Sequence, residues 1–219
     1  EVFAPFIPQF VDVLMEFLKS DNDTFITASL LSFGKLIENH SDLLGDVLPQ
    51  LTPILLEIGS RNMNENLLED ILAFQENQMR MLEENGEAVY EIENKNDEDE
   101  LKLSPHAIPA LALSVFGSIA KNFPQIIPDT IHQVMEEISI QVSNHNEDAM
   151  HKICEAISLL SRGVSKTELP PENKAEIACQ FCNWMLNFIK EAEDINLTAN
   201  AISAVGQIIE VFGAVLIGE

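Results

Sequence analysis

Basic residues are scarce in this chain. Its 219 residues include 12 Lys and Arg against 36 Asp and Glu, which gives a formal net charge of −24 at pH 7. A surface of this sign repels nucleic acid and anionic membranes, because both are negatively charged. The composition therefore excludes these two as main partners. It favours basic protein segments as partners, because long-range attraction would accelerate their association with the chain.

Cysteines and long apolar runs are scarce as well. The three cysteines, Cys154, Cys179 and Cys182, fall on segments with helical periodicity, and an odd number suits a reducing compartment better than a disulfide scaffold. No run of apolar residues approaches the roughly 20 needed to cross a bilayer. Glu1 opens the chain without a signal-peptide pattern. We therefore expect an internal segment of a longer chain, with no membrane insertion.

Motifs for catalysis and metal binding are missing from the sequence. It contains no Gly-rich phosphate loop, no nucleophile elbow and no basic stripe with interleaved aromatics. Cys179-x-x-Cys182 has no second ligand pair at a suitable spacing, so we interpret its thiols as core or half-buried. His145 and His151 lie near Cys154, but no fourth ligand follows. We expect no enzymatic activity, no cofactor and no metal.

One apolar helical phrase with a small residue at its centre occurs three times. Its copies are 29–37, 113–120 and 202–209, with central glycines at 34, 117 and 206, which are 83 and 89 residues apart. Half of each spacing is close to the period of about 40–47 that is typical of HEAT and armadillo repeats. Such a repeat buries its apolar face only by stacking on its neighbours. The sequence therefore predicts an all-α fold, a HEAT-repeat solenoid of antiparallel helix pairs stacked in a right-handed superhelix.

Apolar residues at three- and four-residue steps place the helices. They predict a single solenoid segment of four hairpins, at about 4–40, 43–122, 124–163 and 170–213, with the first (A) helix of each pair on the convex side. An insertion over 59–104 interrupts the second hairpin; the alternative counts 65–84 as a second (B) helix of its own. Gly163 is expected to end the third hairpin, and Val215 to Ile217 to begin a further A helix.

The inward stripes of these helices are expected to form one continuous core. The predicted core residues, in chain order, are Ile7, Phe10, Val11, Leu14, Phe17, Leu18, Ile26, Leu30, Phe33, Ile37, Val47, Leu51, Ile54, Leu55, Ile58, Ile108, Leu111, Ala112, Val115, Ile119, Ile127, Ile131, Val134, Ile138, Ile153, Ala156, Ile157, Leu160, Ile177, Phe181, Trp184, Met185, Phe188, Ala201, Val205, Ile208 and Phe212.

The segment 83–100 is the most acidic part of the chain. It carries one Lys and nine carboxylates, at Glu83, Glu84, Glu87, Glu91, Glu93, Asp97, Glu98, Asp99 and Glu100. Like charges this dense repel one another and cannot be buried, so we expect the segment to be solvated. Two interpretations stay open, a solubilising loop and an acidic arm that contacts a basic partner. Calcium binding is less favoured, because 97–100 lacks the glycine and the ligand spacing of a calcium loop.

The order of these segments resembles the middle of a karyopherin-β, the importin/transportin family of nuclear transport receptors. The phrase 48–56, the acidic insertion and the stretch 111–128 are similar to the family's order of A helix, acidic loop, B helix and next A helix. The resemblance implies a shuttling receptor of cytoplasm and nucleus that binds basic cargo localisation signals, the Ran GTPase and FG-repeat nucleoporins at nuclear pores. It also implies that the loop contacts Ran and helps to couple Ran binding to cargo release, through Glu91, Glu93, Asp97, Glu98, Asp99 and Glu100.

Two other classes of protein remain open beside the transport receptor. One is a HEAT scaffold without a transport role, such as a phosphatase regulatory subunit or a chromosome-organising protein, in which the acidic loop is incidental. The other is a helical domain associated with an enzyme. Both share the helical phrases, so the acidic insertion is the feature that favours the transport receptor.

Overall fold

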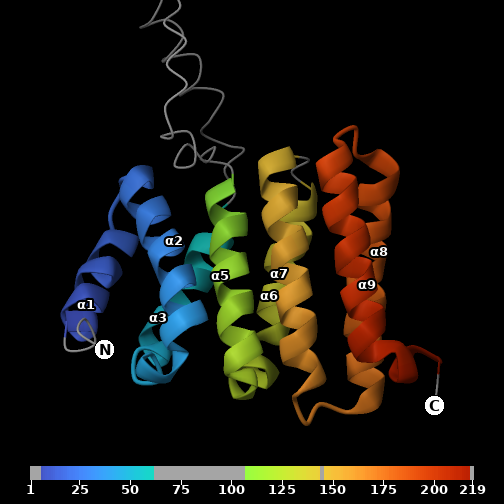
Figure 1. Ribbon diagram of the computed structural model, residues 1–219, viewed down its shortest axis with the longest axis horizontal. Coiled ribbons are helices and arrows are strands. Elements are labelled where there is room, and N and C mark those ends of the chain that lie inside the picture. Colours follow the sequence, from blue (N-terminus) through green and yellow to red (C-terminus); the bar gives the residue numbers. More distant parts are fainter. Residues whose placement is uncertain (1–5, 62–106, 144–145, 218–219) are drawn as a thin grey trace, which may run out of the picture. The chain divides into compact units, whose positions relative to one another are not determined.

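The computed structural model describes residues 6–61, 107–143 and 146–217, and every regular element in these ranges is a helix (Figure 1). The all-α prediction is confirmed for this part of the chain. All these residues belong to one compact unit, formed by Glu1–Arg61 together with Leu103–Glu219. Its α-helices are α1 (Ile7–Leu18), α2 (Asp23–His40), α3 (Leu48–Gly59), α5 (Ile108–Asn122), α6 (Ile127–Ser143), α7 (Glu147–Ser165), α8 (Pro171–Glu191) and α9 (Ile195–Ile217). Two short 3-10 helices, Ser41–Leu43 and Pro124–Ile126, precede α3 and α6.

Asparagine side chains fix the starts of two of these helices. The side-chain oxygen of Asn22 accepts hydrogen bonds from the backbone N–H groups of Thr24 and Phe25, at the start of α2. Asn146 accepts one from the N–H of Ala149 in the same way, at the start of α7. These bonds satisfy donors that a helix leaves unpaired in its first turn.

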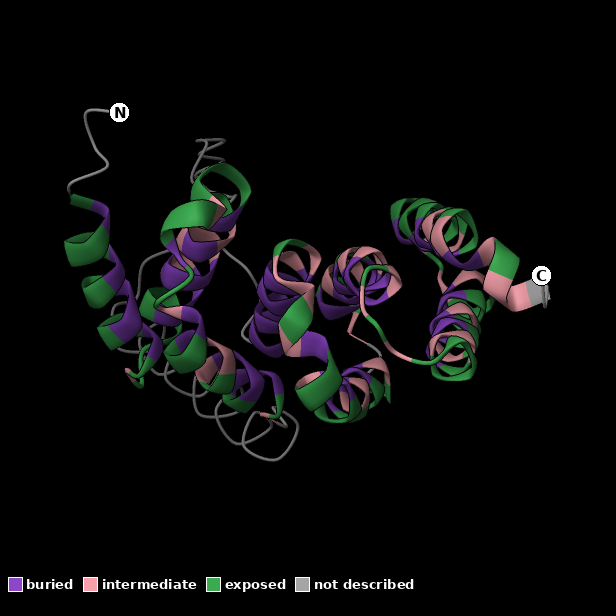
Figure 2. Ribbon diagram, turned by 90° about the horizontal axis from the view of Figure 1, so that it is seen from below, coloured by how far each residue is buried: buried purple, intermediate pink, exposed green. Residues whose placement is uncertain are grey.

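Many of the described helices pack on the next helix but one in the chain, as well as on direct neighbours. α2 packs against α5, α5 against α7 and α7 against α9, while α3 contacts α5 and α6, α6 contacts α7, and α8 contacts α9. Their buried faces turn toward one another (Figure 2). The buried apolar side chains form a single cluster that extends from Ile7 in α1 to Phe212 in α9. The division into four hairpins stays a prediction.

Most of the predicted core residues are buried. All four stripe residues of α6 and all five of α8 are inside, and α5 is buried on more sides than its stripe predicted. The prediction was wrong for Phe10 and Phe17, which are 46% and 37% exposed. Each lies next in sequence to a residue of the buried stripe, and therefore about 100° away from it around the helix. The ring of Phe17 instead stacks on Phe25, with centroids 4.8 Å apart.

The sequence predicted that Gly163 ends its helix. This was wrong, because α7 continues to Ser165. Its lack of a side chain serves helix packing. A Cβ atom at Gly163 would stand 2.7 Å from the carbonyl oxygen of Ala120 in α5. One at Gly117 in α5 would stand 3.0 Å from the carbonyl oxygen of Ala156 in α7. The backbones of α5 and α7 therefore approach each other closely at two glycines.

The end of α9 departs from the sequence prediction in two ways. Val215 to Ile217 belong to α9 and do not begin another helix. The stretch Ile195–Leu216 is also long and apolar enough to cross a membrane by length and composition, with a mean hydropathy of 1.5, and 22% of it is buried. The sequence prediction that no such stretch exists was therefore wrong. Uncharged polar residues interrupt the apolar run. Glu210 is the only ionisable residue from Ile195 to Leu216.

Candidate functional site

A polar groove of about 410 Å³ lies between α7 and α9. The ammonium group of Lys152 pairs with the carboxylate of Glu155 at 3.1 Å on its rim. Arg162 is half-buried and has no ion pair within the described residues. The groove is thus mixed in charge, although the chain as a whole is strongly acidic. The residues that line it are His151, Lys152, Cys154, Glu155, Ser158, Leu159, Arg162, Asn200, Ser203 and Gln207.

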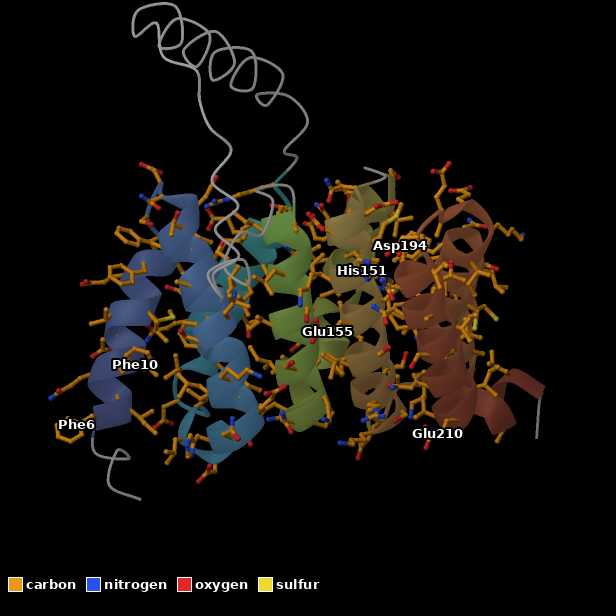
Figure 3. All side chains as sticks on the ribbon, turned by 45° about the horizontal axis from the view of Figure 1, so that its top comes forward. Phe6, Phe10, His151, Glu155, Asp194 and Glu210 are labelled. Atoms are coloured by element: carbon orange, nitrogen blue, oxygen red, sulfur yellow. The ribbon has the colours of Figure 1, made fainter. Side chains whose placement is uncertain are left out.

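A hydrogen-bonded chain of three side chains lies at one end of this groove, which His151 and Asn200 line. Nε2 of His151 in α7 lies 3.1 Å from a carboxylate oxygen of Asp194, which precedes α9 (Figure 3). The side-chain amide of Asn200 in α9 lies 2.9 Å from Nδ1 of the same ring. These bonds use both ring nitrogens of His151, so they fix the imidazole and join α7 to the start of α9.

Asp194 also caps α9. Its two carboxylate oxygens accept hydrogen bonds from the backbone N–H groups of Asn196 and Leu197, at 3.0 and 3.2 Å. The bond from Asn196 has the largest effect and lowers the pKa of Asp194 below its ordinary value; desolvation, the second-largest effect, opposes it, and the bond from Leu197 and the contact with His151 lower the pKa further. The folded state therefore favours the ionised carboxylate.

Neutralising this carboxylate is expected to make stability depend less on pH. Because the pKa of Asp194 is lower in the folded state, its charge stabilises the fold above the pKa of the unfolded chain, about 4. That contribution is lost as the pH falls through the folded-state pKa. Asp194→Asn retains an acceptor but removes the charge, so urea unfolding should show it less stable than the parent at pH 6. The difference should shrink below about pH 4. A constant difference between pH 6 and pH 3 would contradict this assignment.

The cysteine in the groove is a poor nucleophile. Burial raises the pKa of Cys154 to about 12, so its thiol stays protonated near neutral pH. Ser158 donates its hydroxyl to the backbone carbonyl of Cys154 at 2.9 Å. The groups that remain available are amides, hydroxyls and the Arg162 guanidinium. They are suited to hydrogen bonding with the side chains or backbone of a polypeptide.

A second, smaller groove of about 130 Å³ continues this polar surface across α5 to α2. It shares Lys152 and Glu155 with the first groove. On α2 it is bordered by Lys35 and Glu38, which pair at 3.2 Å. Paired side chains of opposite charge therefore line this side of the helices, where the sequence had predicted an acidic surface.

The acidic residues that the sequence singled out, Glu83 to Glu100, lie outside the described residues, as does His145. Of the other candidates, Cys182 is half-buried, as predicted, but Cys179 is exposed, so the prediction that its thiol is core or half-buried was wrong. Cys179 follows the buried Ala178 and points away from the core side of α8. No group of three potential metal ligands occurs among the residues that the structure describes.

The structure also shows polar groups that sequence reasoning missed. Glu137 in α6 is buried, and one of its carboxylate oxygens has no hydrogen-bond partner among the residues that the structure describes. The pKa of Glu137 is raised first by burial and then by the charge of Glu136. One turn further on, the side-chain amide of Gln141 donates to the carbonyl oxygen of Gly59 at 3.1 Å, which ties α6 to the end of α3. No spacing in the sequence indicates these features. Gln141 and Gly59 come from distant segments, and Glu137 is a polar residue on a helix.

Comparison of the chain with protein-family models, with curated proteins and with solved structures finds no match. The functional assignment therefore depends on the residues themselves.

Proposed function

We propose that this chain is a HEAT-type solenoid segment of a nuclear transport receptor, and that it binds basic protein partners through its acidic segment. The partners are basic localisation signals of cargo and the Ran GTPase, with FG-repeat nucleoporins as further ligands of the helices. The observation that carries the proposal is the concentration of nine carboxylates and one Lys in residues 83–100, inserted between helices that share one core.

The packing of the described helices supports a binding role. Apart from α5, which is buried on most sides, each described helix buries one face against its neighbours and leaves the other in solvent, so a long polar surface is available to a partner. The grooves on this surface hold Lys35, Lys152 and Arg162 beside Glu38 and Glu155. Because these charges nearly balance, we assign the attraction for a basic partner to the acidic segment. The grooves then contribute hydrogen bonds at short range.

Neutralising part of the acidic segment is expected to slow the binding of a basic partner. The variant carries Asp97→Asn, Glu98→Gln, Asp99→Asn and Glu100→Gln. Its association rate with GTP-loaded Ran and with a basic cargo peptide, measured by stopped-flow fluorescence, should fall about tenfold at low salt. The loss should diminish near physiological ionic strength, where charges further apart than about 8 Å are screened. The unfolding midpoint should barely change.

A matched control separates the local effect from the loss of net charge. Asp12→Asn, Glu16→Gln, Asp42→Asn and Asp46→Asn remove the same four charges from exposed positions in the first 61 residues. This control should retain most of the parent's association rate. Equal rates for all three proteins at low salt would reduce the segment to a solubilising loop. Equal binding of GTP-loaded and GDP-loaded Ran by the parent would favour a scaffold outside transport.

A further inference from the structure

An apolar cleft of about 310 Å³ opens between α6 and α8. Ile131 and Met135 line it from α6, Ile177 lines it from α8, and Leu169, which precedes α8, completes the apolar lining. Its rim is polar and consists of exposed or half-buried side chains, those of His132, Asn173, Glu176 and Gln180. An apolar interior with a few polar groups at its edge is typical of binding pockets.

Both walls of this cleft belong to helices that are packed on their other sides. α6 packs against α3, α5 and α7, and α8 packs against α7 and α9. The bond from Gln141 to Gly59 also ties α6 to α3. The cleft is therefore a gap between two packed helices, and neither of its walls is the uncovered face of a terminal helix.

Unpaired negative charge surrounds the cleft. Glu176 lines it, and four further exposed carboxylates are each next in sequence to a lining residue, namely Asp129, Glu136, Glu168 and Glu172. Within the described residues, none of the five takes part in an ion pair. α6 contains no Lys or Arg, and Lys174 in α8 donates its ammonium hydrogens to the carbonyl oxygens of Ser165 and Thr167, at 3.1 and 2.6 Å. The cleft thus differs from the polar groove, where cations lie among the acids.

The apolar lining and the surrounding charge together define the ligand. An apolar side chain gains free energy when it leaves water for the cleft, and Lys or Arg on either side of it are attracted by the carboxylates. We propose that the cleft between α6 and α8 is a docking site for a peptide segment in which a large aliphatic side chain is flanked by basic residues. This site goes beyond the function proposed above, because it requires neither the acidic segment nor a transport role.

Changes in the peptide test the chemistry of the ligand. The probe is a fluorescein-labelled peptide with one leucine between two pairs of lysines, and fluorescence anisotropy in about 0.15 M salt measures its Kd. The parent protein should bind it with a Kd of about 10–100 µM. Replacing the leucine by asparagine, or all lysines by glutamine, should raise the Kd about tenfold. Equal binding of either altered peptide would overturn the proposal, because the site would then recognise charge alone or an apolar side chain alone.

Cross-linking locates the bound peptide without any change to the protein. A photoreactive leucine analogue, placed where the probe has its leucine, should cross-link to Met135, Leu169 or Ile177, as identified by mass spectrometry of the digested protein. Cross-links confined to other parts of the chain, or a Kd above about 1 mM for the probe, would overturn the proposal.

Variants of the protein separate the cleft from the general negative charge. Met135→Asp places a charge in the cleft from a half-buried position and should raise the Kd about tenfold. Glu176→Gln should raise it about threefold. Glu191→Gln, at an exposed position of α8 outside the cleft, should leave it unchanged, and equal Kd values for the two glutamine variants would overturn the proposal. The variant neutralised at 97–100 should bind the probe as the parent does at this salt concentration, so this proposal and Ran binding can fail separately.

Discussion

Replacing Phe181 with alanine is expected to lower the free energy of unfolding by about 3–5 kcal/mol. Phe181 in α8 is fully buried, and its ring packs beside that of Trp184 with centroids 6.0 Å apart. The substitution removes apolar surface from the core and leaves a cavity that α8 and α9 cannot close completely. Urea denaturation followed by circular dichroism measures the loss. A protein domain has about 5–15 kcal/mol of stability in total, so the effect is large.

An exposed position on the same helix serves as the control. Cys179→Ala changes a side chain that lies in solvent two residues before Phe181, and should alter stability by no more than about 0.5 kcal/mol. A loss below about 1 kcal/mol for Phe181→Ala would show that this part of the core is loosely packed.

Adding a single methyl group at Gly163 is expected to destabilise the protein by about 1–3 kcal/mol. Alanine favours a helix over glycine, by about 1 kcal/mol. Here the new Cβ would lie 2.7 Å from the backbone oxygen of Ala120 and 2.8 Å from Cδ1 of Ile127. The backbone of α5 cannot yield as a flexible side chain would, so α5 and α7 must move apart.

Gly34→Ala is the matched control for this change. It makes the same substitution inside α2, where no atom of the described residues lies within 4 Å of the added Cβ, and should stabilise the protein by about 0.5–1 kcal/mol. Thermal unfolding of both variants should therefore shift in opposite directions. A shift of Gly163→Ala toward higher temperature would show that α5 and α7 are not in close contact.

Helix positions were predictable from the sequence because they depend on local periodicity. The stripe Ile127, Ile131, Val134 and Ile138 places α6 and its buried face without any knowledge of its neighbours. The role of Gly163 was not predictable in this way. Glycine both ends helices and permits close packing, and only the position of a second helix decides between the two. Phe10 and Phe17 show the same limit, because an apolar residue at the edge of a stripe is buried only if a neighbouring helix covers it.

The candidate site was less predictable than the helices. His151, Asp194 and Asn200 come together from α7, the turn before α9 and α9 itself, and the first two are 43 positions apart in the sequence. Their spacing in the sequence does not indicate a contact, because tertiary packing alone brings them within hydrogen-bond distance. The acidic segment is the opposite case, because density of charge is visible in the sequence itself. Its role depends on a partner, so it stays a prediction.

The bond from Gln141 to Gly59 has a consequence for how the chain folds. It joins residues that are 82 positions apart, and the contacts of α3 with α5 and α6 likewise connect segments on either side of 62–102. Helices α5 to α9 follow one another closely, so they can assemble through short-range contacts. The N-terminal helices α1, α2 and α3 can dock onto the others only when a long loop closes. The entropic cost of closing this loop delays contacts between distant residues. We therefore expect α5 to α9 to form the early folding nucleus and the N-terminal helices to join it in a later, slower phase.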